Sequence, residues 1–444
     1  MAQHRTVHGR PVLGVFERFV HSEVSGSVVL MVCTLAAITW ANSPAAEFYF
    51  ALAHTKIGVS WGDAKFGLSL QHWVNDALMA VFFFVVGLEI KRELTAGRLS
   101  SLRMAALPGM AALGGMLVPA AIYALLNAGG EGARGWGIPM ATDIAFALGV
   151  LALLGERAPI GLKVFLTALA IADDLGAVLV IAVFYTSEIH WGALGLAALF
   201  LGLLFLANLL RVRRWEPYVP LALGVWVGIL ASGVHATVAG ILVAMLVPVR
   251  ARRDPDAFLA TAEARLAELR QAGLSRESML ERRSQLDAIV DLHQAAGDMR
   301  PPGLTLEESL HPIVALFILP LFAFWNAGVA MGGGIGEVLD SRVSLGIVIG
   351  LVAGKQLGIF LFAWIAVRAG WASLPHEVTW SQIYGGACLA GIGFTMSLFV
   401  SELAFGPGAR LDQAKLGILL GSLIAAACGY LFLRLRLPGA ASRA

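Results

Sequence analysis

The sequence has little charge. Only 14% of its 444 residues are Asp, Glu, Lys or Arg, and 58% are hydrophobic, whereas an ordinary globular domain is about 25% charged and about 45–50% apolar. The 32 basic and 30 acidic residues nearly cancel, and no basic run typical of nucleic-acid binding is present. The composition therefore argues against a nucleic-acid partner and predicts a polytopic membrane protein.

Cysteine is equally scarce. Cys33, Cys388 and Cys428 are scattered through apolar runs, without the spacing of a metal site or a disulfide framework. We expect three inert core residues and no cofactor. The polar region before the first apolar run is too long for a signal peptide, so we expect that run to be a retained span.

The long apolar runs predict twelve membrane spans. A hydrocarbon core of roughly 30 Å needs about 20 apolar helical residues. The predicted spans are 25–41, 71–90, 104–127, 136–154, 161–186, 191–210, 217–231, 234–249, 308–330, 343–367, 380–402 and 411–433. The seventh and eighth are short and nearly contiguous, and a single helix there would reverse the orientation of every later span.

Basic residues in the loops predict the orientation. Loops assigned to one side carry most of them, including nine arginines in 250–306. The other side has only Lys56, Lys65, Arg134, Arg342 and Arg410. Basic loops stay in the cytoplasm, so we expect twelve helices with both termini cytoplasmic. The predicted organisation is 1–249 with eight spans, a charged cytoplasmic insertion over 250–306, 307–435 with four spans, and a cytoplasmic tail over 436–444.

Two segments read as non-membrane structure. Residues 55–70 alternate around Gly62-Asp63, which predicts a small extracytoplasmic β-hairpin. An isolated hairpin is marginally stable, so it is either a lid on its own bundle or pairs with a second protomer. In 250–306, apolar residues recur at helical spacing, which predicts amphipathic helices, either as a solvated insertion or as a docking element.

Four charged residues fall deep within predicted spans. Asp173 and Asp174 lie ten and eleven residues after Lys163, or about 15 Å along the helix, near the bilayer midplane. Lys355 is at the middle of its span, and Asp143 lies within the fourth. Such residues cost roughly 2.5–3.5 kcal/mol each and are functional suspects. A structural ion pair needs only two of them. Asp76 is a further intramembrane acid, nearer the outer end of the second span.

The two adjacent aspartates predict a shared site. Consecutive helix residues point about 100° apart, so one can pair with Lys355 while the other faces a cavity. Their carboxylates offer hard oxygen ligands to a small cation. Because repulsion and burial favour protonation, protons and a cation would compete, which is the basis of exchange.

Two spans look interrupted. Pro139 and Thr142 precede Asp143 in the fourth, and the eleventh contains glycines at 385, 386, 391 and 393. Each is the middle of a triplet, spans 3–5 and 10–12, and the triplets are offset by an odd number, which predicts inverted three-helix repeats around a midplane ion site. Asp143 would neutralise helix N-terminal ends and Lys355 C-terminal ends.

The sequence around these residues resembles that of the NhaA family of bacterial sodium/proton antiporters. The resemblance rests on seven stretches in family order: 75–94, 141–159, "KVFLTALAIADDLGA" at 163–177, "GVHATVAG" at 233–240, 310–329, "GKQLG" at 354–358 and "GIGFTMSLF" at 391–399. Inverted repeats are a known property of that family, so the two arguments are not independent.

The resemblance implies a transporter rather than an enzyme. It implies electrogenic export of Na⁺ or Li⁺ in exchange for protons by alternating access, in a bacterial inner membrane. Asp174 would be the principal ion ligand, and Asp173 a second ligand or the partner of Lys355. Thr142 and Asp143 would lie where the two broken spans cross.

The resemblance also implies regulation by pH. Its sensing residues would map to Glu89, Arg92, Glu93 and Glu307, and His235 matches a histidine linked to the pH response. As the alternatives, Glu89, Arg92 and Glu93 are charged side chains at the membrane interface, and His235 is a packed histidine at a helix end. Residues 250–306 depart from the shorter connection typical of the family, so the residues of the family's pH sensor just before span nine, apart from Glu307, do not carry over.

Two partners are predicted, the first from the same resemblance and the second from basic residues. The family is homodimeric through a hairpin between its first two spans, which favours dimer pairing for 55–70. Arg211, Arg213 and Arg214 are candidates to hold anionic lipid headgroups, or they serve only as a topology signal.

Three rival functions remain to be weighed against antiport. Two midplane acids disfavour an organic-anion symporter. An intramembrane aspartyl protease needs aspartates that face each other across a cleft, whereas Asp173 and Asp174 diverge on one helix. A purely structural bundle would not require the acids.

Overall fold

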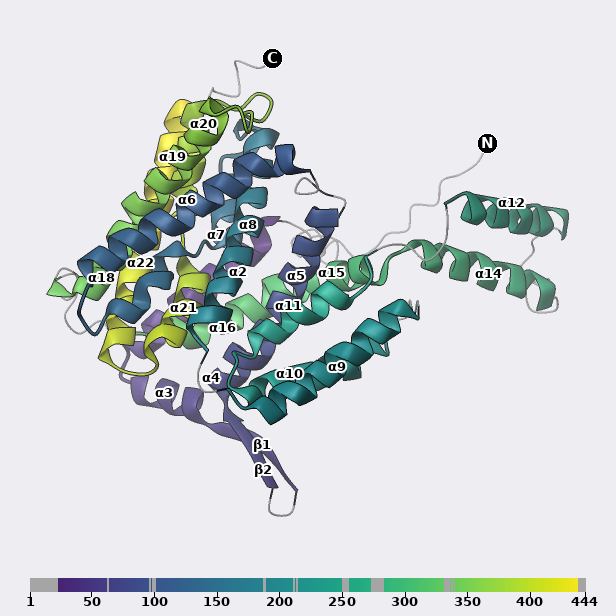
Figure 1. The fold of residues 1–444 in the computed structure, drawn as a ribbon, viewed down its shortest axis with the longest axis horizontal. Helices are drawn as coiled ribbons and strands as arrows, with labels where there is room; N and C mark the ends of the chain where they lie inside the picture. The colour runs from purple at the N-terminus through teal and green to yellow at the C-terminus, as the bar shows by residue number, and fades with distance from the viewer. Residues whose placement is uncertain are drawn as a thin grey trace.

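The structure of the chain is a computed structural model. It describes residues 23–61, 64–95, 97, 101–186, 189–210, 212, 215–249, 255–272, 283–330, 336, 338 and 340–437. These residues form a bundle of helices with one two-stranded sheet, which confirms the predicted all-α polytopic fold (Figure 1).

The first half of the chain contains the hairpin and a series of mostly apolar helical segments. Its elements are α2 (Glu23–Ala41), α3 (Ala46–His54), β1 (Lys56–Trp61), β2 (Ala64–Ser69), α4 (Leu70–His72), η1 (Trp73–Leu78), α5 (Met79–Thr95), α6 (Leu102–Leu126), η3 (Ala133–Met140), α7 (Ile144–Ala152), η4 (Gly155–Arg157), α8 (Ile160–Phe184), α9 (Trp191–Leu209), α10 (Tyr218–Ser232) and α11 (Thr237–Leu246).

The second half begins with two polar helices. Its elements are α12 (Pro255–Ala272), α14 (Arg283–Met299), α15 (Pro302–Ile313), η5 (Val314–Ile318), α16 (Leu319–Asn326), α18 (Arg342–Ile349), η6 (Gly350–Gly354), α19 (Lys355–Arg368), α20 (Trp380–Ala390), α21 (Phe394–Phe405) and α22 (Ala409–Arg436). The segments η1, η5 and η6 are π-helical turns within longer helices.

Among the described residues, 8 helices are long and apolar enough to cross a membrane, and 2 bent pairs raise the number to 10. The helices α10 and α11 are apolar but shorter, so the number of twelve spans stays a prediction. The alternative of one continuous helix in this region is wrong, because Gly233 ends α10 with φ 85° and α11 begins at Thr237. That left-handed conformation suits glycine.

Two groups of helices form the bundle. We call α6, η3–α7, α8, α18–η6–α19, α20–α21 and α22 the repeat bundle, because they cover the two predicted triplets. We call α2, α4–η1–α5, α9, α10, α11 and α15–η5–α16 the flanking helices. Both groups share one large core of buried apolar residues, and a smaller core lies between α9, α10 and α11.

Both predicted helix breaks are confirmed. The fourth span is a 3₁₀ helix, η3, followed by extended backbone at Ala141 and Asp143 before α7 begins. The eleventh is interrupted between α20 and α21, whose axes differ by 45°. The breaks expose backbone groups inside the bundle, which need partners there because lipid offers none.

The predicted hairpin is confirmed over its two strands. β1 and β2 pair antiparallel, from Lys56 opposite Ser69 to Trp61 opposite Ala64, and the turn residues lie outside the described part of the chain. The strands project beyond the helices in Figure 1, which disagrees with a lid on their own bundle.

Helix α3 was not predicted. It lies at 114° to α2, and the Tyr49 hydroxyl fastens it by donating to the Phe324 carbonyl at 2.5 Å.

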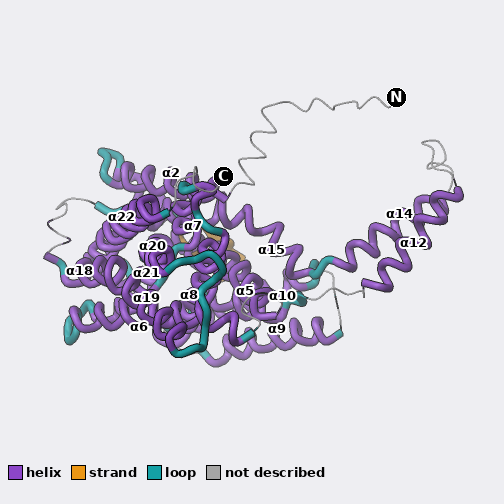
Figure 2. Tube along the Cα trace, turned by 90° about the horizontal axis from the view of Figure 1, so that it is seen from above, coloured by secondary structure: helices purple, strands orange, loops and turns teal. Residues whose placement is uncertain are grey.

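Helices α12 and α14 occupy the charged segment between α11 and α15. They lie side by side and extend away from the bundle in both views (Figures 1 and 2). Arg265 of α12 joins them through an ion pair to Asp291 of α14 at 2.6 Å. The hydrogen bond to Glu268, together with the charge of Asp291, raises the pKa of the Arg265 guanidinium.

One expectation about the core is wrong. Cys388 is buried and Cys33 is half-buried, but Cys428 is exposed on α22. Lipid and protein interior are both apolar, so hydrophobicity alone does not separate the two environments.

The contact of α6 with α19 depends on two glycines. A Cβ on Gly358 would collide with the Gly114 carbonyl and lie 3.0 Å from Val118 Cβ, whereas one on Gly109 would have nothing within 4 Å. We expect Gly358→Ala to destabilise the protein by about 1–3 kcal/mol, the cost of overpacking, measured as a lower Tm in detergent. Gly109→Ala, on the facing helix α6, is the control. Equal Tm values for the two variants would contradict this close approach.

Candidate functional site

The two broken spans cross, and each satisfies backbone groups of the other. The Asp143 N–H donates to the Ile392 carbonyl at 2.7 Å, and the Ser397 hydroxyl donates to the Ile138 carbonyl at 2.8 Å. The Thr142 hydroxyl lies 3.1 Å from the Ala390 carbonyl. The crossing is therefore a specific contact that fixes η3–α7 against α20–α21.

Asp143 sits between two helix N-termini. Its Oδ1 accepts from the Phe146 N–H at 3.0 Å and so caps α7. Its Oδ2 accepts from the N–H and the hydroxyl of Thr395, in the first turn of α21, at 3.0 and 2.5 Å. The aspartate is 2% exposed, and its negative charge offsets the positive ends of both helix dipoles. The sequence argument did not name Thr395, although a threonine two residues after the "GIG" break was the available signal.

Lys355 lies at the opposite helix ends. Its side chain is 1% exposed. The ammonium contacts the carbonyl of Met140, the last residue of η3, and donates to Asp173 Oδ2 at 2.6 Å. It thus compensates both a helix C-terminus and a carboxylate. The π-turn η6 directly precedes Lys355, and such turns occur frequently at functional sites.

Only one of the two carboxylate oxygens of Asp173 accepts hydrogen bonds from the described residues. Oδ2 accepts from Lys355 and from the Thr142 hydroxyl at 2.6 Å. Oδ1 is buried and has no hydrogen-bond partner. Since buried polar atoms are normally paired, this oxygen is free to bind a ligand that donates a proton or carries positive charge.

Asp174 completes the site. It is 4% exposed, and within the described ranges no hydrogen bond reaches its carboxylate. It interacts electrostatically with Asp173, Asp143, Lys355 and Glu89 of α5. The described residues hold no group of three or more His, Cys, Asp or Glu side chains suited to a metal. The site is therefore two adjacent carboxylates with three free oxygens, one lysine and one hydroxyl.

The candidate pH-sensing residues fall in two places. Arg92 of α5 pairs with Glu307 of α15 at 3.1 Å, and Glu89 interacts electrostatically with Arg92 and Glu93. His235 is elsewhere: its Nε2 lies 3.6 Å from Asp76 Oδ1, and its ring packs edge-on against Phe399. Asp76 and Glu89 are thirteen residues apart on one span, about 20 Å at 1.5 Å per residue.

The predicted lipid ligands Arg211, Arg213 and Arg214 lie outside the described residues. The remaining predicted site residues are described. Thr142, Asp143, Asp173, Asp174 and Lys355 meet at the crossing, whereas Asp76 with His235 and Glu89 with Arg92, Glu93 and Glu307 lie toward opposite ends of the bundle.

Comparison with known proteins agrees over nearly the whole chain. The family model described as "Na+/H+ antiporter 1" matches residues 17–433. The NhaA Na⁺/H⁺ antiporter of Oleidesulfovibrio alaskensis is 46% identical over 443 residues, covering 98% of both chains. That of Acidithiobacillus ferrooxidans is 48% identical over 425 residues, covering 95% of this chain and 97% of its own. A third, from Bordetella parapertussis, is 47% identical over 425 residues, with 96% and 97% covered.

The matched region contains both broken helices, the aspartate pair and the buried lysine. The family consists of secondary transporters, not enzymes, and the apolar helices agree with a multi-pass membrane protein. The chain therefore belongs to the NhaA family of Na⁺/H⁺ antiporters.

Proposed function

We propose that the protein exports Na⁺ or Li⁺ in exchange for protons by alternating access, with Asp174 as the principal ion ligand. One observation carries this proposal. The bundle buries two adjacent carboxylates, and Lys355 neutralises only Asp173. A buried charge without a partner is costly, so Asp174 requires either a proton or a cation.

That requirement produces exchange. When Na⁺ binds, the free oxygens of Asp174 and Asp173 Oδ1 supply hard ligands of the kind that small cations prefer, and any proton on Asp174 leaves. When the cation leaves, a proton returns to the carboxylate. The two ligands are mutually exclusive, so a site that alternates between the two faces couples their opposite movements.

Electrogenic exchange needs a second proton per cation. The site offers two carriers for it, Asp173 and Lys355, whose ion pair at 2.6 Å would open when Asp173 turns to the cation. Thr142 would hold Asp173 Oδ2 in either case. Asp143 would support this exchange indirectly, because its oxygens cap two helices and its charge acts on Asp174.

The surroundings of the site support further proposals. The distribution of loop arginines favours a bacterial inner membrane with both termini cytoplasmic and the hairpin outside. Among the described residues, each strand of the projecting hairpin pairs only with the other, and the free strand edges favour pairing with a second copy as a homodimer. The arginines at 211, 213 and 214 remain proposed contacts for anionic lipid.

The first prediction concerns Asp174. In everted membrane vesicles energised to acid inside, Na⁺ should dissipate the pH gradient, and Asp174→Asn should abolish this response because a neutral amide cannot exchange a proton for a cation. Asp287→Asn removes a charge from an exposed position of α14 and should leave the response unchanged. Full activity of Asp174→Asn would contradict the assignment.

The second prediction concerns the buried ion pair. Lys355→Gln leaves Asp173 buried without its cation, and losing one partner of such a pair costs about 3–5 kcal/mol. We expect a lower Tm in detergent and a substantial recovery in Asp173→Asn/Lys355→Gln, which buries no unpaired charge. Transport by the double variant then reports whether the pair carries the second proton. Equal Tm values for single and double variants would refute the coupling.

The third prediction concerns pH regulation. Glu307 faces Arg92 and Glu89 across the α5–α15 contact, with Glu308 and His311 on its own helix. If its protonation contributes to shutdown at acid pH, Glu307→Gln mimics the acid form. We expect the activity–pH curve of Na⁺/H⁺ exchange to move to higher pH, with the same maximal rate. Glu263→Gln, at an exposed position of α12, is the matched control, and an unshifted curve for Glu307→Gln would remove it from the sensor.

A further inference from the structure

A cavity of about 380 Å³ lies at the hairpin end of the bundle, between the repeat bundle and the flanking helices. Flanking helices contribute polar side chains to one wall, namely Gln71, His72, Asn75 and Asp76. The repeat bundle contributes Glu402, Asp412 and Lys415 to the other. None of these repeat-bundle residues belongs to the ion site at the crossing.

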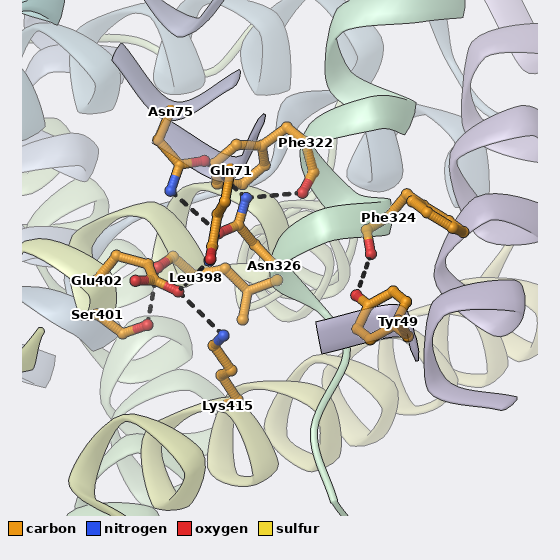
Figure 3. Close-up of polar contacts among 10 residues, drawn as sticks. All are labelled: Tyr49, Gln71, Asn75, Phe322, Phe324, Asn326, Leu398, Ser401, Glu402 and Lys415. Carbon is orange, nitrogen blue, oxygen red and sulfur yellow. Dashed lines mark hydrogen bonds and ion pairs between the residues drawn. The ribbon is translucent and has the colours of Figure 1, made fainter. Parts of the chain in front are cut away.

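Glu402 of α21 is the polar group that joins the two walls. Its Oε1 lies 3.0 Å from the Lys415 ammonium of α22, and the two side chains are 15% and 6% exposed. The same oxygen accepts from the Gln71 amide of α4 at 3.3 Å. Figure 3 shows Glu402 between Lys415 and Gln71. One carboxylate oxygen thus has one partner in its own group of helices and one in the other.

Gln71 is held rigidly on the flanking side. Its Nε2 also donates to Asn326 Oδ1 at 3.1 Å. Asn326, at the end of α16, is fully buried and exchanges hydrogen bonds with Asn75 at 2.8 and 3.1 Å. Because Asn326 also donates to the Phe322 carbonyl, α4, η1 and α16 form one hydrogen-bonded support for Gln71 (Figure 3).

The apolar contact below Glu402 joins the same two groups. Phe399 precedes Glu402 by three residues, so both lie on one face of α21. Its ring packs against Phe83 of α5 and Phe322 of α16, with centroids 5.5 and 6.1 Å apart. The aromatic contact fills the space between the repeat bundle and the flanking helices, but it is not directional. The Gln71–Glu402 hydrogen bond is directional, so it depends on how the two groups of helices are placed relative to each other.

We propose that Glu402, anchored by Lys415, is a positioning residue that holds the hairpin end of the transport pathway closed through its bond to Gln71. This rests on alternating access, as proposed above, with the hairpin end facing outward. When the two groups separate at that end, Lys415 moves together with Glu402, because both belong to the repeat bundle, and the bond to Gln71 breaks. The bond therefore favours the outward-closed state.

The size of the effect follows from the type of bond. A hydrogen bond to a charged group shifts an equilibrium by about tenfold or more. An apparent affinity scales with the fraction of protein in the binding-competent state. The ratio of the apparent KM for Na⁺ at the outer face to that at the cytoplasmic face should therefore fall by the same factor when the bond is removed.

The test measures Na⁺-dependent exchange in right-side-out and everted vesicles at matched pH. We expect Gln71→Leu to lower the outer-to-cytoplasmic KM ratio about tenfold, with the maximal rate retained. Gln71→Asn, which is polar but one methylene too short, provides a second variant if the first does not fold. Leu403→Met, in the same cavity wall, is the control and should leave the ratio unchanged.

A second measurement identifies the partner. In Glu402→Gln/Lys415→Met, which removes the ion pair without leaving one charge buried, adding Gln71→Leu should change the ratio much less than in the unmodified protein. An unchanged ratio in both Gln71 variants with normal maximal rates would overturn the proposal. Absence of Na⁺-dependent exchange in the unmodified protein would instead overturn the proposed function.

Discussion

The compensation of charge where two interrupted helices cross is the constraint on which the rest of the structure depends. Each break leaves helix ends inside an apolar bundle, and those ends carry partial charges that water does not reach. The carboxylate of Asp143 offsets the positive N-terminal ends of α7 and α21, and the ammonium of Lys355 offsets the negative C-terminal end of η3. With these two residues fixed, Asp173 is held by Lys355 and Thr142, and Asp174 is left as a buried carboxylate that accepts no hydrogen bond from the described residues.

The same principle separates the roles of the buried acids. Both oxygens of Asp143 accept hydrogen bonds from groups that cannot leave the protein. Asp174 differs from Asp143 because, among the described residues, no fixed group hydrogen-bonds to its carboxylate. Asp173 lies between these cases, with one oxygen in fixed bonds and one free. Burial alone would have placed all three in one class, since each is at most 4% exposed.

Much of this arrangement was predictable from the sequence. Depth along an apolar run located Asp173, Asp174 and Lys355, and glycine and proline located both breaks. Helix α3 was missed, because nine residues are too few to show a span. The bond between Gln71 and Glu402 was missed because it joins side chains 331 residues apart, and neither periodicity nor local spacing encodes such pairing. The prediction that Cys428 is a core residue was wrong, because an apolar helix in lipid has no polar outer face that would reveal its orientation.

The π-turn η6 sets more than the position of one lysine. Its wider turn contains one residue more than an α-helix of the same height, so the residues on either side of it are rotated relative to each other by about 100°. Helix α18 can therefore present one face to α22 while α19 presents an independent face to α6. In a regular helix through Gly350–Gly354, the direction of the α18 face would determine the direction of the α19 face. The side chain of Lys355 would then leave the helix in a different direction, away from both Met140 and Asp173.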